Sequence, residues 1–143
     1  MMKFCWILTL MIVSSSLANS SVRPLFDAIR EVETGGHSDP TNAKGDGGRS
    51  LGPYQITWAY WKDSALPGRY RMVRQKAYAE RVMTAYWRRY CPHALTRHDF
   101  QTLARIHNGG PKGATSINTI AYWRRVRQKL SWFAPSSTRY NRK

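Results

Sequence analysis

The stretch that decides the fold runs from Glu33 to Ile56 and reads ETGGHSDPTNAKGDGGRSLGPYQI. It begins at the end of an expected helix, passes through a segment rich in Gly, Asn, Asp and Pro, and closes on a short apolar patch. This composition suits hairpin turns, so we expect the small sheet of the protein here. Two acids stand out in the stretch, Glu33 at the helix end and Asp46 in a turn.

The residues before Glu33 have the spacing of an amphipathic helix. Pro24 suits a first helical turn, where its missing N–H costs nothing, and the Gly-Gly pair at 35–36 is a stop signal. At ~100° per residue counted from Leu25, Glu33 falls near ~80° and Glu31 near ~240°. We therefore expect Glu31 to face water and Glu33 to lie on the apolar stripe, which consists of Leu25, Phe26, Ile29 and Val32.

The position of Glu33 indicates acid chemistry. Removal from water disfavours the charged form, so its pKa should rise, and a carboxyl group protonated near neutral pH can donate to a leaving group. Each acid also has a structural interpretation, because a helix-end Glu can cap backbone and an Asp in a Gly-rich turn usually bonds its own backbone. A glycosidase needs one protonated acid and one carboxylate on opposite sides of the bond, and Glu33 with Asp46 could supply both.

Further motifs follow in order along the chain: YWKD at 60–63, YWRRYCP at 86–92, HNGGPKG at 107–113 and YW at 122–123. With the stretch from Glu33 to Ile56, they resemble the invertebrate-type lysozyme family, which includes destabilase. The resemblance spans roughly residues 25–130. It implies a lysozyme-like fold with the catalytic acid at Glu33 and the second carboxylate at Asp46, the latter after small shifts in loop length.

The same resemblance implies a set of substrate-binding residues that border the cleft: Ser50, Tyr54, Gln55, Tyr60, His107, Asn108 and Gly109. Two of them have a structural alternative. Aromatic residues at helical spacing are usually core, which we expect for Trp61 and leave open for Tyr60. His107 is either a satisfied core histidine or a substrate contact.

The implied function is that of a muramidase, which hydrolyses the β-1,4 bond between N-acetylmuramic acid and N-acetylglucosamine in bacterial peptidoglycan. Chitin oligosaccharides fit the same cleft. In this scheme Glu33 protonates the glycosidic oxygen, and Asp46 stabilises or attacks the oxocarbenium centre. Two alternatives stay open: a lytic transglycosylase, which needs Glu33 but not Asp46, and a non-enzymatic cationic antimicrobial or lectin-like protein.

The resemblance to destabilases also raises isopeptidase activity as a candidate function for this chain. Relatives proposed to use a Ser/Lys pair carry Lys directly after Gln-Ile, where this chain has Thr57. Ser50 therefore lacks that partner, and we do not expect the activity.

The charge of the chain points to anionic partners. Lys and Arg number 23 against 8 Asp and Glu, a formal net charge of +15, which attracts bacterial surfaces by long-range electrostatics. Nucleic acids are anionic too, but the sequence has no nucleic-acid-binding motif beyond its charge. The four His residues and Cys91 form no metal-ligand spacing, so we expect neither a metal nor a cofactor.

The first 20 residues read as a secretory signal peptide. Lys3 precedes an apolar run at 4–13, and Ser16 with Ala18 fits a cleavage site, so cleavage is expected after 18 or 20. The run is too short to span a bilayer, and no later stretch is suitable, which predicts a secreted, extracellular protein. Cleavage removes Cys5 and leaves Cys91 as a lone cysteine without an internal partner.

We predict one α+β domain over residues 21–134, mostly helical, with a small β-hairpin lobe beside the catalytic cleft, and a basic tail at 135–143. Helices are expected over 57–65, over 69–90, from an N-cap at Thr96 to His107, and over 116–130. The inward residues of the last helix are expected to be Ile117, Ile120, Trp123 and Leu130.

Overall fold

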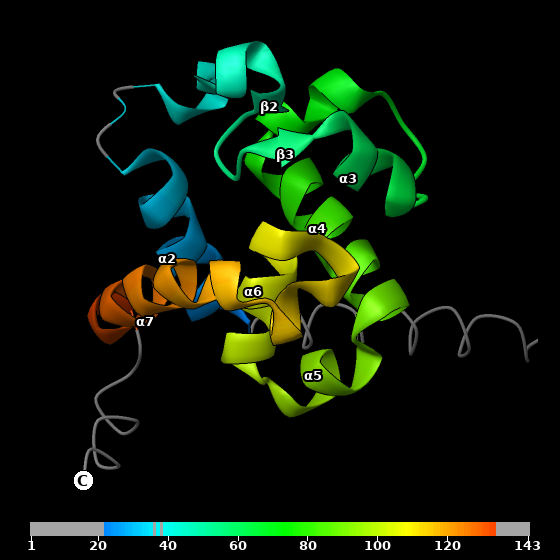
Figure 1. The fold of residues 1–143 in the computed structure, drawn as a ribbon. Helices are drawn as coiled ribbons and strands as arrows, with labels where there is room; N and C mark the ends of the chain where they lie inside the picture. The colour runs from blue at the N-terminus through cyan, green and yellow to red at the C-terminus, as the bar shows by residue number, and fades with distance from the viewer. Residues whose placement is uncertain (1–21, 36, 38, 134–143) are drawn as a thin grey trace, which may run out of the picture.

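The fold is known from a computed structural model, which describes residues 22–35, 37 and 39–133. The predicted signal peptide and basic tail lie outside these residues. The described chain is mostly helical with one small antiparallel sheet, as predicted (Figure 1). The helices gather below and behind the sheet in the view of Figure 1, so the sheet forms a separate lobe.

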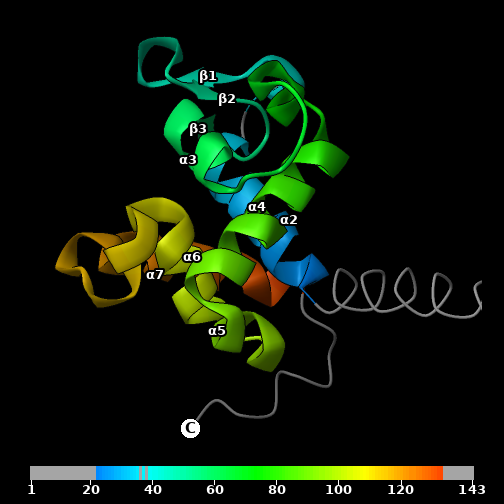
Figure 2. The same ribbon diagram turned by 90° about the vertical axis from the view of Figure 1, so that its right-hand side faces the viewer.

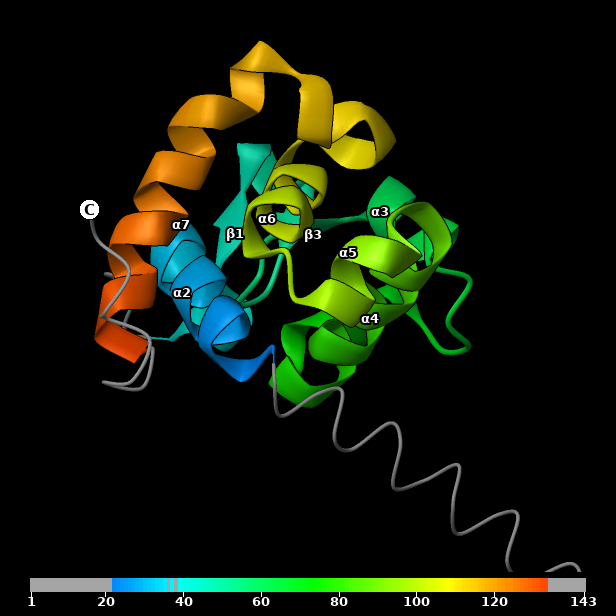
Figure 3. The same cartoon turned by 90° about the horizontal axis from the view of Figure 1, so that it is seen from below.

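Helix α2 (Arg23–Thr34) is the predicted helix before the Gly-rich stretch. Pro24 lies in its first turn, and it ends at Gly35. Its apolar stripe is buried, with Leu25, Phe26 and Ile29 removed from solvent. On its outer side α2 packs along α7 (Ile120–Phe133), and the two helices lie side by side when seen from below (Figure 3). This packing places the end of α2 next to the start of α7.

The sheet occupies the predicted segment. Its strands are β1 (Lys44–Gly45), β2 (Ser50–Leu51) and β3 (Ile56–Thr57), paired antiparallel in chain order (Figure 2). The turn between β1 and β2 has positive φ at Asp46 (51°), Gly47 (69°) and Gly48 (94°). Glycine adopts these angles freely and Asp tolerates them, so the Gly-Asp-Gly-Gly sequence makes this tight reversal possible.

The predicted helix over 69–90 is wrong in its first part. Helix α4 (Lys76–Tyr90) is preceded by a 3₁₀ segment at Tyr70–Arg74, and Gln75 between them is extended. The sheet lobe holds this segment in place: the Tyr70 hydroxyl donates to the Ile56 carbonyl at 2.8 Å. Gly52 approaches so closely that a Cβ there would lie 2.4 Å from the Val73 carbonyl oxygen. These tertiary contacts override the continuous helical pattern of the sequence.

Thr96 is not an N-cap, contrary to prediction. It lies inside the short helix α5 (Pro92–Arg97), which ends at His98 in the left-handed conformation. Asp99 instead caps α6 (Phe100–Gly109): its carboxylate accepts from the Thr102 backbone N–H at 3.1 Å and from its hydroxyl at 2.6 Å. The cap thus lies three residues after the predicted one, because Thr and Asp are both good caps.

Helix α7 starts at Ile120, four positions after the predicted start at Ser116, because a 3₁₀ turn at Ile117–Thr119 precedes it. Its buried residues are Tyr122 and Val126, while Trp123 and Leu130 are partly buried against the core. Ile117 is 78% exposed and Ile120 37% exposed, so the prediction that both face inward is wrong. The inward face therefore centres on Tyr122.

Aromatic side chains fill the core between the helices. Trp87 of α4 is fully buried and stacks on Phe26 of α2 with ring centroids 5.5 Å apart. Its indole N–H donates to the Leu103 carbonyl of α6 at 3.0 Å. One residue thus joins three helices, and its polar atom is satisfied. The core holds without any covalent link among the residues described.

Cys91, at the junction of α4 and α5, is a buried free cysteine. A native disulfide typically contributes roughly 2–4 kcal/mol of stability. We therefore expect reductant to leave the melting temperature of the monomer unchanged, measured by circular dichroism with and without dithiothreitol. A large drop in melting temperature with reductant contradicts this, because it would show Cys91 paired between two chains.

Candidate active site

Glu33 lies in the last turn of α2, where its side chain is 20% exposed. Burial raises the pKa of this carboxyl group to about 7, and the negative charge of Asp46 adds to the rise. A hydrogen bond from Tyr122 and the charge of Arg125 oppose it. Desolvation is the largest of these effects, as the position of Glu33 on the apolar stripe predicts. Near neutral pH a large fraction of Glu33 therefore carries a proton.

Tyr122 fixes the orientation of this carboxyl group. Its hydroxyl donates to Oε1 of Glu33 at 2.7 Å, across 89 positions of sequence. The Tyr122 side chain is buried in the first turn of α7, which runs alongside α2. With Oε1 engaged as an acceptor, the proton of the neutral acid belongs on Oε2. Glu33 is thus held with one oxygen bonded and one available.

His107, near the end of α6, is buried, with Nε2 3.7 Å from Oε1 of Glu33. Burial lowers the pKa of this imidazole to about 4, against a weaker opposing effect from the backbone of Tyr54. His107 is therefore neutral at the pH where Glu33 titrates, and the contact is not an ion pair. Instead His107 forms one wall of the apolar environment that keeps Glu33 protonated.

Tyr60, in α3 (Trp58–Asp63), backs the other side of His107. Its hydroxyl lies 3.3 Å from Nδ1 of His107, and its ring stacks on Tyr86 at 3.8 Å between centroids. Tyr60 is buried, which resolves the open alternative in favour of core. Trp61, which was expected in the core, is partly buried against it, and its indole N–H donates to the Tyr78 hydroxyl at 2.9 Å.

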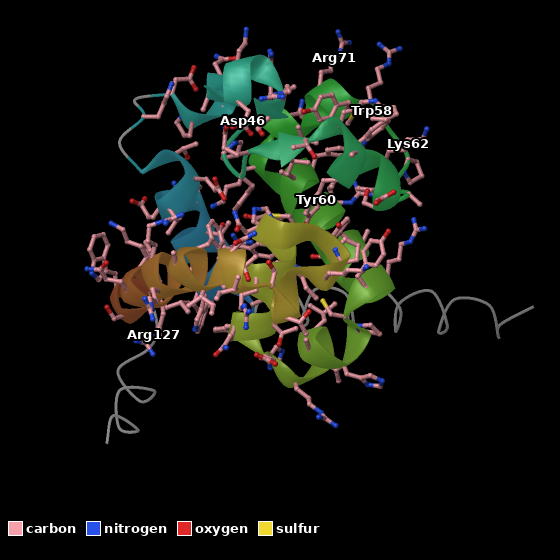
Figure 4. The ribbon with its side chains drawn as sticks, in the orientation of Figure 1. Asp46, Trp58, Tyr60, Lys62, Arg71 and Arg127 are labelled. Atoms are coloured by element: carbon pink, nitrogen blue, oxygen red, sulfur yellow. The ribbon has the colours of Figure 1, made fainter. Side chains whose placement is uncertain are left out.

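Asp46 lies in the sheet lobe, in the turn after β1, and is exposed (Figure 4). Its Oδ2 accepts from the Ser50 hydroxyl at 3.1 Å, and its backbone carbonyl accepts from Arg49 Nε at 2.9 Å. Ser50 is buried, so its hydrogen bond fixes the orientation of the Asp46 carboxylate. Since Asp46 raises the pKa of Glu33, the two acids lie within electrostatic reach of each other.

A cavity of about 600 Å³ opens beside Glu33. The end of α2, the segment around β1, one residue of the loop between β2 and β3 and one residue of α7 line it: Glu31, Val32, Glu33, Thr34, Gly35, His37, Ala43, Lys44, Gly45, Gln55 and Lys129. Gln55 is the predicted binding residue that this wall includes. Glu31 is half-buried in the same wall, so the expectation that it faces water holds only in part.

The other predicted binding residues take different places. Tyr54 is fully buried, donates to Oε1 of Glu80 at 2.5 Å and does not line the cavity. Asn108 and Gly109 are exposed at the end of α6 and do not line the cavity. The structure thus places His107 against Glu33 and puts Gln55 in the same cavity lining as Glu33. Asp46 and Ser50 lie in the sheet lobe outside this lining, and Tyr54 and Tyr60 have structural positions.

Three residues of α7 at the site were not predicted: Tyr122, Arg125 and Lys129. The YW motif at 122–123 was the available signal for Tyr122, but the sequence does not show that α7 packs along α2. Within residues 22–133 as described, no three His, Cys, Asp or Glu side chains gather as a metal site. None of the described helices has the length and apolar character to cross a membrane.

A helical domain with a small antiparallel sheet lobe, and a partly buried Glu at a helix end beside a cavity, are the features of a lysozyme-like fold. The chain belongs to the Destabilase family, whose model matches residues 26–129. Two solved structures are similar: Tapes japonica lysozyme, with a TM-score of 0.61 and 28% identity, and inhibitor-bound Meretrix lusoria lysozyme, with 0.60 and 29%. Each match covers 73% of this chain and 87% of the other.

Curated relatives are also lysozymes. Lysozyme 1 of Crassostrea virginica is 40% identical over 79 residues, covering 54% of this chain and 43% of its own. The lysozyme of Magallana gigas is 35% identical over 82 residues, covering 56% and 60% respectively. The chain thus spans about half the length of these relatives.

Proposed function

We propose that this protein is a muramidase that hydrolyses the β-1,4 bond between N-acetylmuramic acid and N-acetylglucosamine of bacterial peptidoglycan. The observation that carries the proposal is Glu33: a carboxyl group with a pKa near 7, oriented by Tyr122 and facing a cavity of ligand size. Membership of the Destabilase family and the lysozyme names of its relatives support the same reaction. Clearing of a Gram-positive cell suspension by wild type and Glu33→Gln tests it.

In the proposed reaction Glu33 is the general acid. Its protonated oxygen donates to the glycosidic oxygen as the bond to the anomeric carbon breaks, so the leaving sugar departs as a neutral alcohol. Asp46, in the turn after β1 of the sheet lobe, is the proposed second acid, which either stabilises or attacks the oxocarbenium-like centre. Ser50 holds Asp46 by its hydrogen bond, and neutral His107 keeps the surroundings of Glu33 poorly solvated.

We further propose that the protein is secreted and acts outside the cell. The predicted signal peptide at 1–20 supports this, and so does the formal charge of +15, which concentrates the protein at anionic bacterial surfaces. Chitin oligosaccharides are proposed as minor substrates of the same cleft.

Asp46→Asn separates a two-carboxylate hydrolase from a lytic transglycosylase. For a hydrolase we expect a loss of about 100-fold or more in the rate, because the substitution removes the charge that stabilises the oxocarbenium centre. Ser50→Ala should reduce the rate less than Asp46→Asn does, since the carboxylate of Asp46 remains. Rates and products are measured by chromatography of digested peptidoglycan. An active Asp46→Asn protein that releases 1,6-anhydro products overturns the hydrolase in favour of the transglycosylase.

Tyr122→Phe tests the positioning of the acid. The hydroxyl stabilises ionised Glu33, so its removal should raise the pKa of Glu33 further and move the alkaline limb of the pH–activity profile upward. We expect kcat to fall about tenfold at the optimum, because the carboxyl group loses its fixed orientation. The profile is measured from pH 4 to 9 on soluble peptidoglycan. A lower rate with an unmoved alkaline limb would assign Tyr122 a packing role only.

A further inference from the structure

The cavity beside Glu33 is lined by three further charged residues that the proposed reaction does not use. They are Glu31 at the end of α2, Lys44 of β1 and Lys129 of α7. The cavity volume of about 600 Å³ is larger than the space that the Glu33 carboxyl group and a glycosidic oxygen occupy. Because Glu33 belongs to the same wall, a sugar that fills the cavity lies next to the scissile bond.

Lys129 is a held cation rather than a freely solvated one. It is half-buried, and its Nζ lies 3.7 Å from the centre of the exposed Trp132 ring, one turn further along α7. A cation over an indole face is attracted by the ring, which restricts where the ammonium group can go. None of the ion pairs found between described residues involves Lys129 or Lys44. The two ammonium groups are thus available to a ligand.

The balance of charge in the cavity favours an anion. Its ionisable lining residues are Glu31, Glu33, His37, Lys44 and Lys129. When Glu33 carries the proton that the reaction requires, Glu31 is the one acid of this lining that can oppose the two lysines. Arg125, whose charge acts on Glu33 from α7, adds to the positive potential. An uncharged sugar gains nothing from this arrangement, whereas a sugar that carries a carboxylate does.

We propose that this cavity is a carboxylate-recognition subsite, in which Lys129 and Lys44 bind an acidic group carried by the sugar beside the scissile bond. The inference rests on the proposed function, since it places this sugar by the position of Glu33. Ammonium–carboxylate hydrogen bonds are about twice as strong as neutral ones, so the subsite selects acidic sugars over N-acetylglucosamine. The carboxylate comes either from the 3-O-lactyl group of N-acetylmuramic acid or from a peptide attached to it.

The test measures binding in the Glu33→Gln background, so that no probe is cleaved. The probes are a peptide-free tetrasaccharide of alternating N-acetylglucosamine and N-acetylmuramic acid, the same tetrasaccharide with its stem peptides, and uncharged chitotetraose. Lys129→Gln is compared with Arg127→Gln by titration calorimetry at low salt. Arg127 is the matched control: it is exposed on the side of α7 away from the sheet lobe and outside the cavity lining (Figure 4).

We expect Lys129→Gln to weaken binding of an acidic tetrasaccharide about tenfold, the worth of one charge-assisted hydrogen bond, and to change chitotetraose binding less than about twofold. Arg127→Gln should leave both within about twofold, because a distant charge is screened. Lys44→Gln should act in the same direction as Lys129→Gln. A loss for the peptide-free probe assigns the lactyl carboxylate, and a loss confined to the peptide-bearing probe assigns the stem peptide.

Two results overturn the proposal. An equal loss for chitotetraose means that Lys129 only packs against sugars, and an equal loss with Arg127→Gln means that the effect is net charge. If the proposed function is wrong, the wild-type protein will not hydrolyse peptidoglycan. The binding comparison does not depend on that result. Selective binding without hydrolysis would keep the subsite and reject the muramidase.

Discussion

Glu33→Gln should lower the rate of peptidoglycan hydrolysis by about 10²–10⁴-fold, the range that a positioned general acid contributes. Gln keeps the shape of the side chain and can still accept the hydrogen bond from Tyr122, but it has no proton to give to the glycosidic oxygen. The measurement is the initial rate of turbidity loss in a Gram-positive cell suspension. A soluble peptidoglycan fragment serves as a second substrate, because it removes effects of binding to whole cells.

Glu31→Gln is the matched control, since it is the same substitution two positions earlier on α2. Glu31 lines the cavity but receives no hydrogen bond from Tyr122, so hydrolysis should continue and any change should fall on KM. If Glu31→Gln abolishes hydrolysis while Glu33→Gln retains it, the assignment of the acid is wrong.

Glu33→Gln should also change the pH dependence of stability. The pKa of Glu33 is about 7 in the folded protein against 4.5 as its ordinary value, so the folded state binds the proton more tightly. Stability therefore falls as the pH rises through this window, and Glu33→Gln should avoid the loss. We expect the variant to be more stable than wild type by roughly 3 kcal/mol at pH 8 and about equal at pH 4. Thermal melts across pH check this.

Killing of bacteria is a separate readout from hydrolysis. α7 presents exposed Arg124 and Arg127, with Trp132 62% exposed near its end, and such a basic, aromatic surface can act on an anionic membrane without catalysis. Killing that survives Glu33→Gln with no hydrolysis would favour the cationic antimicrobial alternative.

The features predicted correctly from sequence are local ones. The stop at Gly35, the wheel position of Glu33 and the turn-forming run after Lys44 each depend on residues a few positions apart, so periodicity and turn chemistry reveal them. The raised pKa of Glu33 follows from the same wheel, because the stripe it lies on is the one that α2 buries.

The features that were missed depend on distant contacts. Tyr122 meets Glu33 across 89 positions, and no pattern within α7 indicates which of its aromatic residues faces α2. The break at Gln75 arises from the sheet lobe packing on the preceding segment. Tyr54 and Gln55 are neighbours in one motif, yet Tyr54 is buried and bonded to Glu80, whereas Gln55 lines the cavity. The resemblance to the family predicted that Tyr54 and Gln55 both bind substrate, since it does not distinguish their side-chain positions.

Glu80 should be the most sensitive charged residue for stability. Its carboxylate accepts two hydrogen bonds from Arg23, at 2.6 and 2.5 Å, and one from the Tyr54 hydroxyl at 2.5 Å. Burial alone would raise the pKa of Glu80, but these hydrogen bonds and the charges of Arg23 and Lys76 outweigh it, and the pKa is lowered. The carboxylate thus ties the start of α2 and the loop before β3 to α4.

Glu80→Ala should destabilise the fold by about 3 kcal/mol, because it leaves the buried Tyr54 hydroxyl and the Arg23 guanidinium without their acceptor. In a domain of this size that loss lowers the melting temperature by about 10 °C or more. Asp27→Ala is the control: its ion pairs to Arg23, Arg30 and Lys76 are 3.8–3.9 Å long, and we expect a cost below about 1 kcal/mol.

Two further measurements separate the network from simple loss of packing. Since the pKa of Glu80 is lowered in the folded state, its contribution is present above the unfolded pKa of 4.5 and lost as the pH falls through the folded value, so wild type and Glu80→Ala should converge in acid. The triple variant Arg23→Met, Tyr54→Phe, Glu80→Leu removes every partner together and should recover most of the loss. A triple variant as unstable as Glu80→Ala would show that packing around α4, and not the orphaned donors, sets the cost.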